Sequence, residues 1–295
     1  MPSGAVVEHF LIEVAIYYIL TWSIYLNYRQ GHLYVGSFFT MGLAAYLTTF
    51  AIRDWGWPFE LAVLTSVALG AGIAFLLALR LGKASSFANM LGSLAPLLVF
   101  QVVVRNLEFL GGAMGLFAIP KVGYLLPFTL GAAALVGLAV YRWDHSHLGR
   151  AQDVLSDAPE VAATQGTTAY KFAVALETAA GAMGGLVGAI YAPFVGSISP
   201  HGFNFGLIIN SATFLFVGGH TTMWGLVVFT PILWGLRIFL PSQAASWTLI
   251  IYGTLLAAVI LLRPEGVITR QVLRSIRVNS QALVERLKTV LANRV

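Results

Sequence analysis

Within the long apolar segments of this chain, one carboxylate stands out as a group that could do chemistry. Glu177 lies about two helical turns, or roughly 9 Å along a helix axis, from Lys171. Ionisable groups in apolar segments are costly and usually face protein or water. Glu177 is therefore either a pathway carboxylate that contacts the amine or amide of a solute, or a neutral or snorkelling carboxylate.

Amide side chains in apolar segments have the same two kinds of role. Each could line a pathway for a polar solute, or could form hydrogen bonds between helices. With Glu177, the candidates for a translocation pathway are Asn27, Gln101, Asn204 and Asn210.

Motifs for enzymatic chemistry are absent from the sequence. The chain has no cysteine, no His-Glu-x-x-His and no Gly-x-Ser-x-Gly. His145 and His147 lack a further ligand at a familiar metal spacing. The sequence thus predicts neither an enzyme nor a metal or cofactor site, and any ATP-driven work must come from another polypeptide.

One long polar stretch between apolar segments carries the signals of a short capped helix. Asp157 suits the N-cap, Pro159 the first turn and Glu160 the positive end of a helix that Gly166 would end. Small residues such as Ala162 leave room for another protein. The stretch is either a connector or a docking element, and connectors are usually shorter, at about 4–6 residues.

Composition indicates what must position these residues. Hydrophobic residues make up 58% of the 295 residues, charged residues make up 10%, and the mean hydropathy is +0.81. This favours an all-α polytopic membrane protein with about nine spans, since a span needs roughly 20 mostly apolar residues. The second and seventh spans, which are Gly-rich and short respectively, are candidates for bent or re-entrant segments. The nine segments run over residues 6–28, 33–52, 58–79, 87–104, 122–141, 171–195, 203–218, 223–240 and 244–262.

The distribution of Lys and Arg predicts the orientation. If residues 142–170 form a cytoplasmic loop, the N-terminus lies outside and the C-terminus lies in the cytoplasm. Most basic residues then fall inside. The exceptions are Arg53, Arg105, Lys121 and Arg237. The net charge of +5 then indicates attraction to anionic membrane lipid, which we expect as a partner, and not binding to nucleic acid.

Two further regions have a regular pattern. Small residues recur every four positions from Gly181 to Ala189, which is typical of close helix packing in lipid. We assign residues 1–266 to a transmembrane domain and 267–295 to a cytoplasmic amphipathic tail. Apolar residues at helix spacing place this tail on the membrane surface, or alternatively on a partner subunit or in a disordered state.

The cytoplasmic loop resembles the coupling loop of ABC-importer permeases of the branched-chain amino-acid family, which includes urea and amide relatives. The matching stretches are Gly149-Arg150-Ala151 and Ser156 to Gly166. The resemblance implies that an ATPase subunit contacts this loop. The residues concerned are Gly149, Arg150, Asp157, Pro159, Glu160, Ala162 and Gly166.

Other stretches are similar to the same family in the same order. They include residues 27–46, the Gly-rich 111–120, 185–192, 198–200, 218–225 and 263–266. The resemblance implies that Gly111, Gly112 and Gly115 belong to a periplasmic loop. The sequence departs from the family pattern in three places: at Leu110, at residues 220–223, and at Glu177 together with the early Tyr170-Lys171 pair. These departures bear on which solute is transported and leave the expected architecture unchanged.

The family implies an importer in a bacterial inner membrane. Its expected partners are a second homologous permease, two cytosolic ATP-binding subunits and an external solute-binding protein. The implied solutes are branched-chain amino acids or related small polar molecules such as urea, amides and aromatic acids. An ion-coupled secondary transporter is the main alternative and a purely structural membrane subunit is another.

Overall fold

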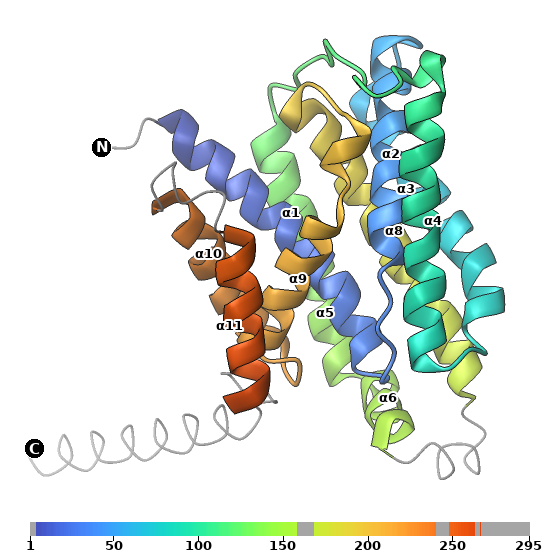
Figure 1. Cartoon of the computed structure of the whole chain (residues 1–295), viewed down its shortest axis with the longest axis vertical. Helices are drawn as coiled ribbons and strands as arrows, with labels where there is room; N and C mark the ends of the chain where they lie inside the picture. Colours follow the sequence, from blue (N-terminus) through green and yellow to red (C-terminus); the bar gives the residue numbers. More distant parts are fainter. Residues whose placement is uncertain (1–3, 158–167, 240–247, 263–265, 267–295) are drawn as a thin grey trace, which may run out of the picture.

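The computed structural model describes residues 4–157, 168–239, 248–262 and 266, and helices dominate these residues (Figure 1). Only an isolated antiparallel bridge between Leu116 and Ile198 adds β-pairing within them. The helices are α1 Gly4–Tyr28, α2 Gly36–Arg53, α3 Phe59–Leu81, α4 Ser86–Asn106, α5 Leu125–His145, α6 His147–Asp157, α8 Ala169–Val195, α9 Phe205–Gly218, α10 Met223–Phe239 and α11 Thr248–Leu262, with 3₁₀ turns η1 Glu108–Leu110 and η2 Pro200–Gly202.

Five helices of the described chain are long and apolar enough to cross a membrane, namely α1, α3, α4, α5 and α8. The other predicted spans are helical but shorter; α9, for example, has 14 residues. At 1.5 Å per residue, α9 is about 21 Å long, against roughly 30 Å for the hydrocarbon core. The structure thus bears out an all-helical protein suited to a membrane, while the number of complete spans stays a prediction.

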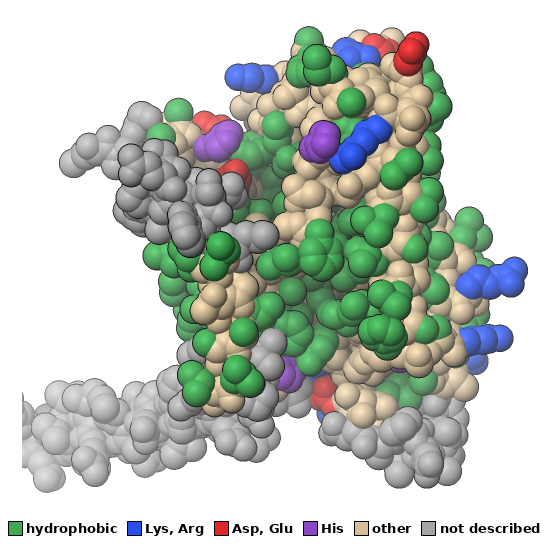
Figure 2. Space-filling view, in the orientation of Figure 1, with side chains coloured by type: hydrophobic (Ala, Val, Ile, Leu, Met, Phe, Trp, Pro, Cys, Tyr) green, Lys and Arg blue, Asp and Glu red, His purple; other side chains and the backbone are tan. Residues whose placement is uncertain are grey.

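Large apolar side chains cover much of the outer surface, as Figure 2 shows for one face. Leu64 and Leu76 of α3, Leu98 of α4 and Leu135 of α5 are all more than half exposed. A water-soluble protein rarely exposes so continuous an apolar surface, whereas lipid solvates it.

Helix α1 crosses the bundle obliquely and is buried along most of its length (Figure 1). It packs against α5 and α8 on one side and against α9 and α10 on the other. The main core gathers around α1, α2 and α8, and a smaller core joins α1 to α9, α10 and α11 through residues such as Tyr17, Phe214 and Tyr252. α1 thus joins the two parts of the bundle.

The glycine pattern of α8 is explained by two close helix contacts. A Cβ on Gly184 or Gly188 would meet backbone oxygens of Ser37 and Met41 in α2. A Cβ on Gly185 would meet the backbone of Ser66 in α3. The small residues that recur every four positions therefore face two neighbouring helices, and α8 contacts the backbones of both.

We expect Gly185→Ala to lower the free energy of unfolding by about 1–3 kcal/mol, since the atoms it meets are backbone and cannot move cheaply. The matched control is Gly72→Ala in α3, where a new Cβ meets nothing within 4 Å. SDS titration of the purified protein in mixed micelles measures both variants. Equal stability of the two would show that the α3–α8 contact is looser than described.

The chain preceding α2 and α9 is not helical. Residues 32–35 have no regular secondary structure up to the start of α2, and the backbone N–H of Val35 donates to Ser93 Oγ in α4 at 3.2 Å. Before α9, Asn204 accepts from the N–H of Gly206 at 2.8 Å and so caps the helix. Both helices are therefore shortened at their N-terminal ends.

Different elements lie at the two ends of the bundle. Figure 1 shows the start of α1 and the loop between α4 and α5 at one end, and α6 at the opposite end. We call these the loop end and the α6 end. The predicted orientation makes the loop end external and the α6 end cytoplasmic.

Candidate functional site

A pocket of about 370 Å³ opens between α1, α2, α8, α9 and α10. His9 and Glu13 come from the first half of α1, and Val195 is the last residue of α8, so the pocket lies toward the loop end. Its apolar lining consists of Ile16, Met41, Phe194, Val195 and Leu207. The volume is in the range typical of small-molecule sites.

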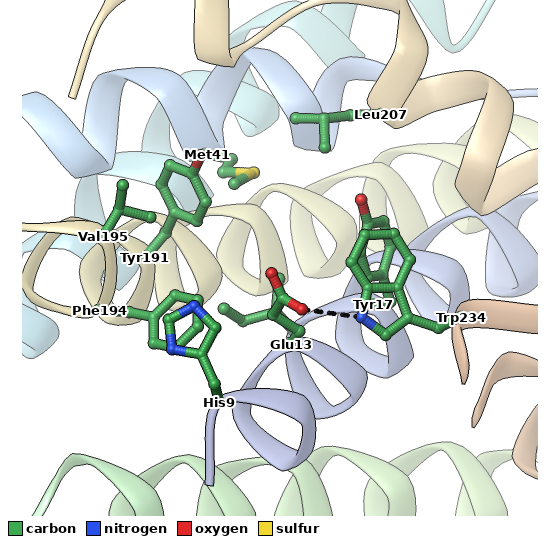
Figure 3. A pocket seen from close by; sticks show the side chains of 10 residues that line it. His9, Glu13, Tyr17, Met41, Tyr191, Phe194, Val195, Leu207 and Trp234 are labelled. Carbon is green, nitrogen blue, oxygen red and sulfur yellow. Dashed lines mark hydrogen bonds between the residues drawn. The ribbon is translucent and has the colours of Figure 1, made fainter. Parts of the chain in front are cut away.

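The polar part of the pocket is built around Glu13. Trp234 Nε1–H donates to Glu13 Oε2 at 2.9 Å, and the Trp234 ring lies against Tyr17 at a centroid distance of 4.3 Å. Figure 3 shows the other carboxylate oxygen turned away from Trp234, toward the space between Tyr191 and Tyr17. Trp234 thus holds one oxygen of Glu13 and leaves the other facing the pocket.

Further aromatic side chains line the pocket. The ring of His9, which is exposed, lies against Phe194 at a centroid distance of 4.3 Å. Tyr191, from the last turns of α8, stands across the pocket from Tyr17 (Figure 3). The pocket therefore combines one carboxylate with several aromatic faces.

Glu177 lies elsewhere, fully buried between α8 and α4. Asn89 Nδ2 of α4 donates to Glu177 Oε1 at 2.6 Å. Asn89 is also fully buried, so this hydrogen bond joins two helices deep in the protein. Glu177 does not line the pocket described above.

The predicted pathway amides make protein contacts. Asn27 donates to the carbonyl oxygens of Ser23 and of Leu176, the residue before Glu177, at 3.0 and 3.4 Å. Gln101 donates to the carbonyl of Phe203 at 2.6 Å, and Asn204 caps α9. Asn210 Nδ2 lies 3.5 Å from the hydroxyl of Tyr17, which lines the pocket. Asn210 is thus the amide among them that contacts the pocket wall.

At the α6 end, a buried arginine ties three helices together. Arg29 follows α1, and its side chain is 4% exposed. It pairs with Asp144 of α5 and with Asp153 of α6, the latter at 2.6 Å. Tyr25 also donates to Asp144 at 2.8 Å. Burial lowers the pKa of Arg29, but Tyr25 and the two carboxylates outweigh it and raise the pKa above its ordinary value, so the side chain stays charged.

Neutral side chains complete this anchor. Gln152 of α6 donates to the carbonyl of Leu26 at 2.5 Å and accepts from Trp143 Nε1–H at 2.8 Å. Gln30 donates to the carbonyl of Ala169, the first residue of α8, at 2.8 Å. Hydrogen bonds and ion pairs therefore fix α6 to the end of α1, and sequence reasoning pointed to none of them.

The segment around α6 differs from the sequence expectation. Gly149 and Arg150, expected in a loop, are helical residues of α6, and Asp157, expected as a cap for the next helix, ends α6. A Cβ on Gly149 would meet backbone oxygens of Trp143 and Asp144, so α6 lies close against the end of α5. Pro159, Glu160, Ala162, Gly166 and the predicted tail 267–295 lie outside the described residues.

The glycine loop at the other end docks onto the chain that follows α8. Gly111, Gly112 and Gly115 all have positive φ, which glycine adopts without strain. A Cβ on Gly115 would meet the carbonyl oxygen of Ile198, which accepts from the N–H of Leu116 at 2.8 Å. The loop is thus fixed beside the end of α8.

Comparison with known proteins gives one match. The family described as the branched-chain amino acid transport system permease component matches residues 6–260. No curated protein and no solved structure matches the chain significantly. The match extends from the first turn of α1 almost to the end of α11 and so covers both the pocket and the anchored α6. The chain therefore belongs to the permease family of branched-chain amino acid transport systems, and is a multi-pass membrane protein.

Proposed function

We propose that this chain is the permease subunit of an ATP-driven importer for branched-chain amino acids or related small polar solutes. In this proposal it works beside a second homologous permease, takes solute from an external binding protein and is driven by two cytosolic ATP-binding subunits. The chain itself binds no cofactor and catalyses no reaction.

The proposal rests on one structural observation: in this member of the family, α6 is fixed to α1 by hydrogen bonds and an ion pair. Arg29 and Gln152 connect α6 to α1, and α1 also contributes His9 and Glu13 to the pocket near the other end. A movement imposed on α6 would therefore reach the pocket through one continuous helix. Such rigid coupling is what a subunit driven by a separate ATPase requires.

Copurification from the native membrane tests the proposed assembly. The tagged chain, extracted in mild detergent, is expected to retain a second permease and ATP-binding subunits, identified by mass spectrometry, with measurable ATPase activity. Recovery of the chain alone, under conditions that preserve other membrane complexes, would contradict it.

The proposed orientation makes a separate prediction for the loop end. Ala113 is exposed between Gly112 and Met114, and the native chain has no cysteine. We expect Ala113→Cys to react with an impermeant thiol reagent added from outside. The matched control is Ser86→Cys, at the exposed first residue of α4, which should react only after the cytoplasmic side is opened. The reverse labelling pattern would show that the chain has the opposite orientation in the membrane.

A further inference from the structure

We propose that the pocket around Glu13 binds the ammonium group of a solute and places the aliphatic part of that solute against the apolar wall. The inference rests on the proposed transport function and names the chemical class that the pocket selects. The shared chemistry is a primary ammonium group next to a short apolar chain, carried by a free solute rather than by a lipid headgroup.

Charge is the first argument. Glu13 is an acid, and neither Lys nor Arg lines the pocket among the described residues. A solute that carries only a carboxylate would meet repulsion from Glu13, and the described lining holds no Lys or Arg to offset it; the imidazole of His9 lies against Phe194 at the exposed edge. The pocket therefore favours solutes that carry an amine.

Preorganisation is the second argument. Trp234 holds one oxygen of Glu13 by a hydrogen bond of 2.9 Å, and Tyr17 packs against the Trp234 ring. The carboxylate is thus oriented before a ligand arrives, which lowers the entropic cost of binding. The remaining oxygen faces the pocket and can accept a charge-assisted hydrogen bond from an ammonium group (Figure 3).

The surrounding surfaces fit the rest of the ligand. Tyr17 and Tyr191 also line the pocket, and aromatic rings attract a cation placed over an open face. Ile16, Met41 and Leu207 offer an apolar wall for an aliphatic chain. A metal ion is a poorer occupant, because no group of three or more His, Asp or Glu residues within the described chain is arranged to hold one. An aliphatic amine or amino acid therefore suits the pocket best.

Binding to the purified chain, with its copurifying subunits, in phosphatidylcholine nanodiscs tests this inference directly. The probes are L-leucine, isopentylamine, which keeps the amine alone, and isocaproate, which keeps the carboxylate alone. Calorimetry should show binding of leucine and isopentylamine and none of isocaproate. Binding of isocaproate as tight as that of leucine would overturn the proposal.

Two variants and one control locate the site. Glu13→Gln keeps an acceptor for Trp234 but removes the charge, and we expect it to weaken amine binding about tenfold or more. Val195→Trp, at an exposed pocket residue, should weaken binding by filling the space without disturbing the core. Glu8→Gln, an exposed acid on the same helix, should leave binding unchanged. Unchanged affinity in both pocket variants would refute the site.

The lipid alternative and the transport function are tested separately. Phosphatidylethanolamine in the nanodisc could abolish leucine binding and remain bound to the chain in native mass spectrometry only when Glu13 is present. In that case the ligand is a lipid and the proposal fails. Calorimetric binding needs no ATP. Thus Glu13-dependent binding without ATP-driven uptake would contradict the transport function alone, and uptake with Glu13-independent binding would contradict the pocket alone.

Discussion

Arg29→Ala is expected to lower the free energy of unfolding by about 3 kcal/mol, the lower part of the range for breaking a buried ion pair. The substitution leaves Asp144, which is 12% exposed, without its cation. Asp153 is 31% exposed, so water offsets part of its loss. In the proposed importer we also expect ATP hydrolysis with little uptake, because α6 loses its ion-paired link to α1 and, among the described residues, keeps only the hydrogen bond from Gln152 to Leu26.

The same substitution at the surface provides the control. Arg53 pairs with Asp54 at 2.9 Å, but both side chains are substantially exposed. Arg53→Ala should therefore cost only about 0–1 kcal/mol and leave uptake coupled to hydrolysis. SDS titration gives the stabilities, and parallel ATPase and uptake assays give the coupling. If the two variants lose equal free energy of unfolding and both keep uptake coupled to ATP hydrolysis, Arg29 does not transmit movement between α6 and α1.

Asn89→Ala is expected to cost about 2–3 kcal/mol, because it leaves the fully buried Glu177 without its hydrogen-bond donor. Asn106→Ala is the matched control, since this exposed amide of the same helix bonds only within α4. Adding Glu177→Leu to Asn89→Ala should recover much of the loss, as both polar partners are then gone. An additive loss in the double variant would mean that the two side chains do not stabilise each other.

Glu177→Gln separates a structural role of Glu177 from a role in the pathway. Glutamine keeps the shape and can still accept from Asn89, so assembly should persist. If Glu177 contacts solute, uptake by the Glu177→Gln variant should change its preference among solutes or its dependence on pH. Identical kinetics for every transported solute across the pH range would leave Glu177 with the hydrogen bond to Asn89 alone.

The sequence predicted the long helices well for a simple physical reason. In lipid, a run of apolar residues such as α3 or α8 must satisfy its backbone hydrogen bonds within the segment and therefore forms a helix. Local composition thus decides its structure, whichever helices it packs against. The glycine stripes of α8 are also local, and their packing role followed from spacing alone. The family resemblance also predicted the order of these elements along the chain.

The polar sites could not be predicted in the same way, because their partners are far apart in the sequence. Glu13 meets Trp234 in another helix, and Arg29 meets Asp144 and Asp153 across the bundle. The sequence predicts a loop where α6 forms, since this stretch is polar, and the Arg29 and Gln152 contacts that fix α6 follow from no local pattern. For Gln101 and Asn204, the sequence identified polar groups in apolar surroundings but not the backbone groups that they bond.

Uptake into proteoliposomes tests the central claim most directly. The purified complex that contains this chain is reconstituted with a binding protein loaded with radiolabelled leucine outside and with ATP or its non-hydrolysable analogue inside. We predict accumulation of leucine that requires hydrolysable ATP and persists when ion gradients are collapsed. Accumulation that needs an ion gradient and is indifferent to ATP would contradict the account and identify a secondary transporter.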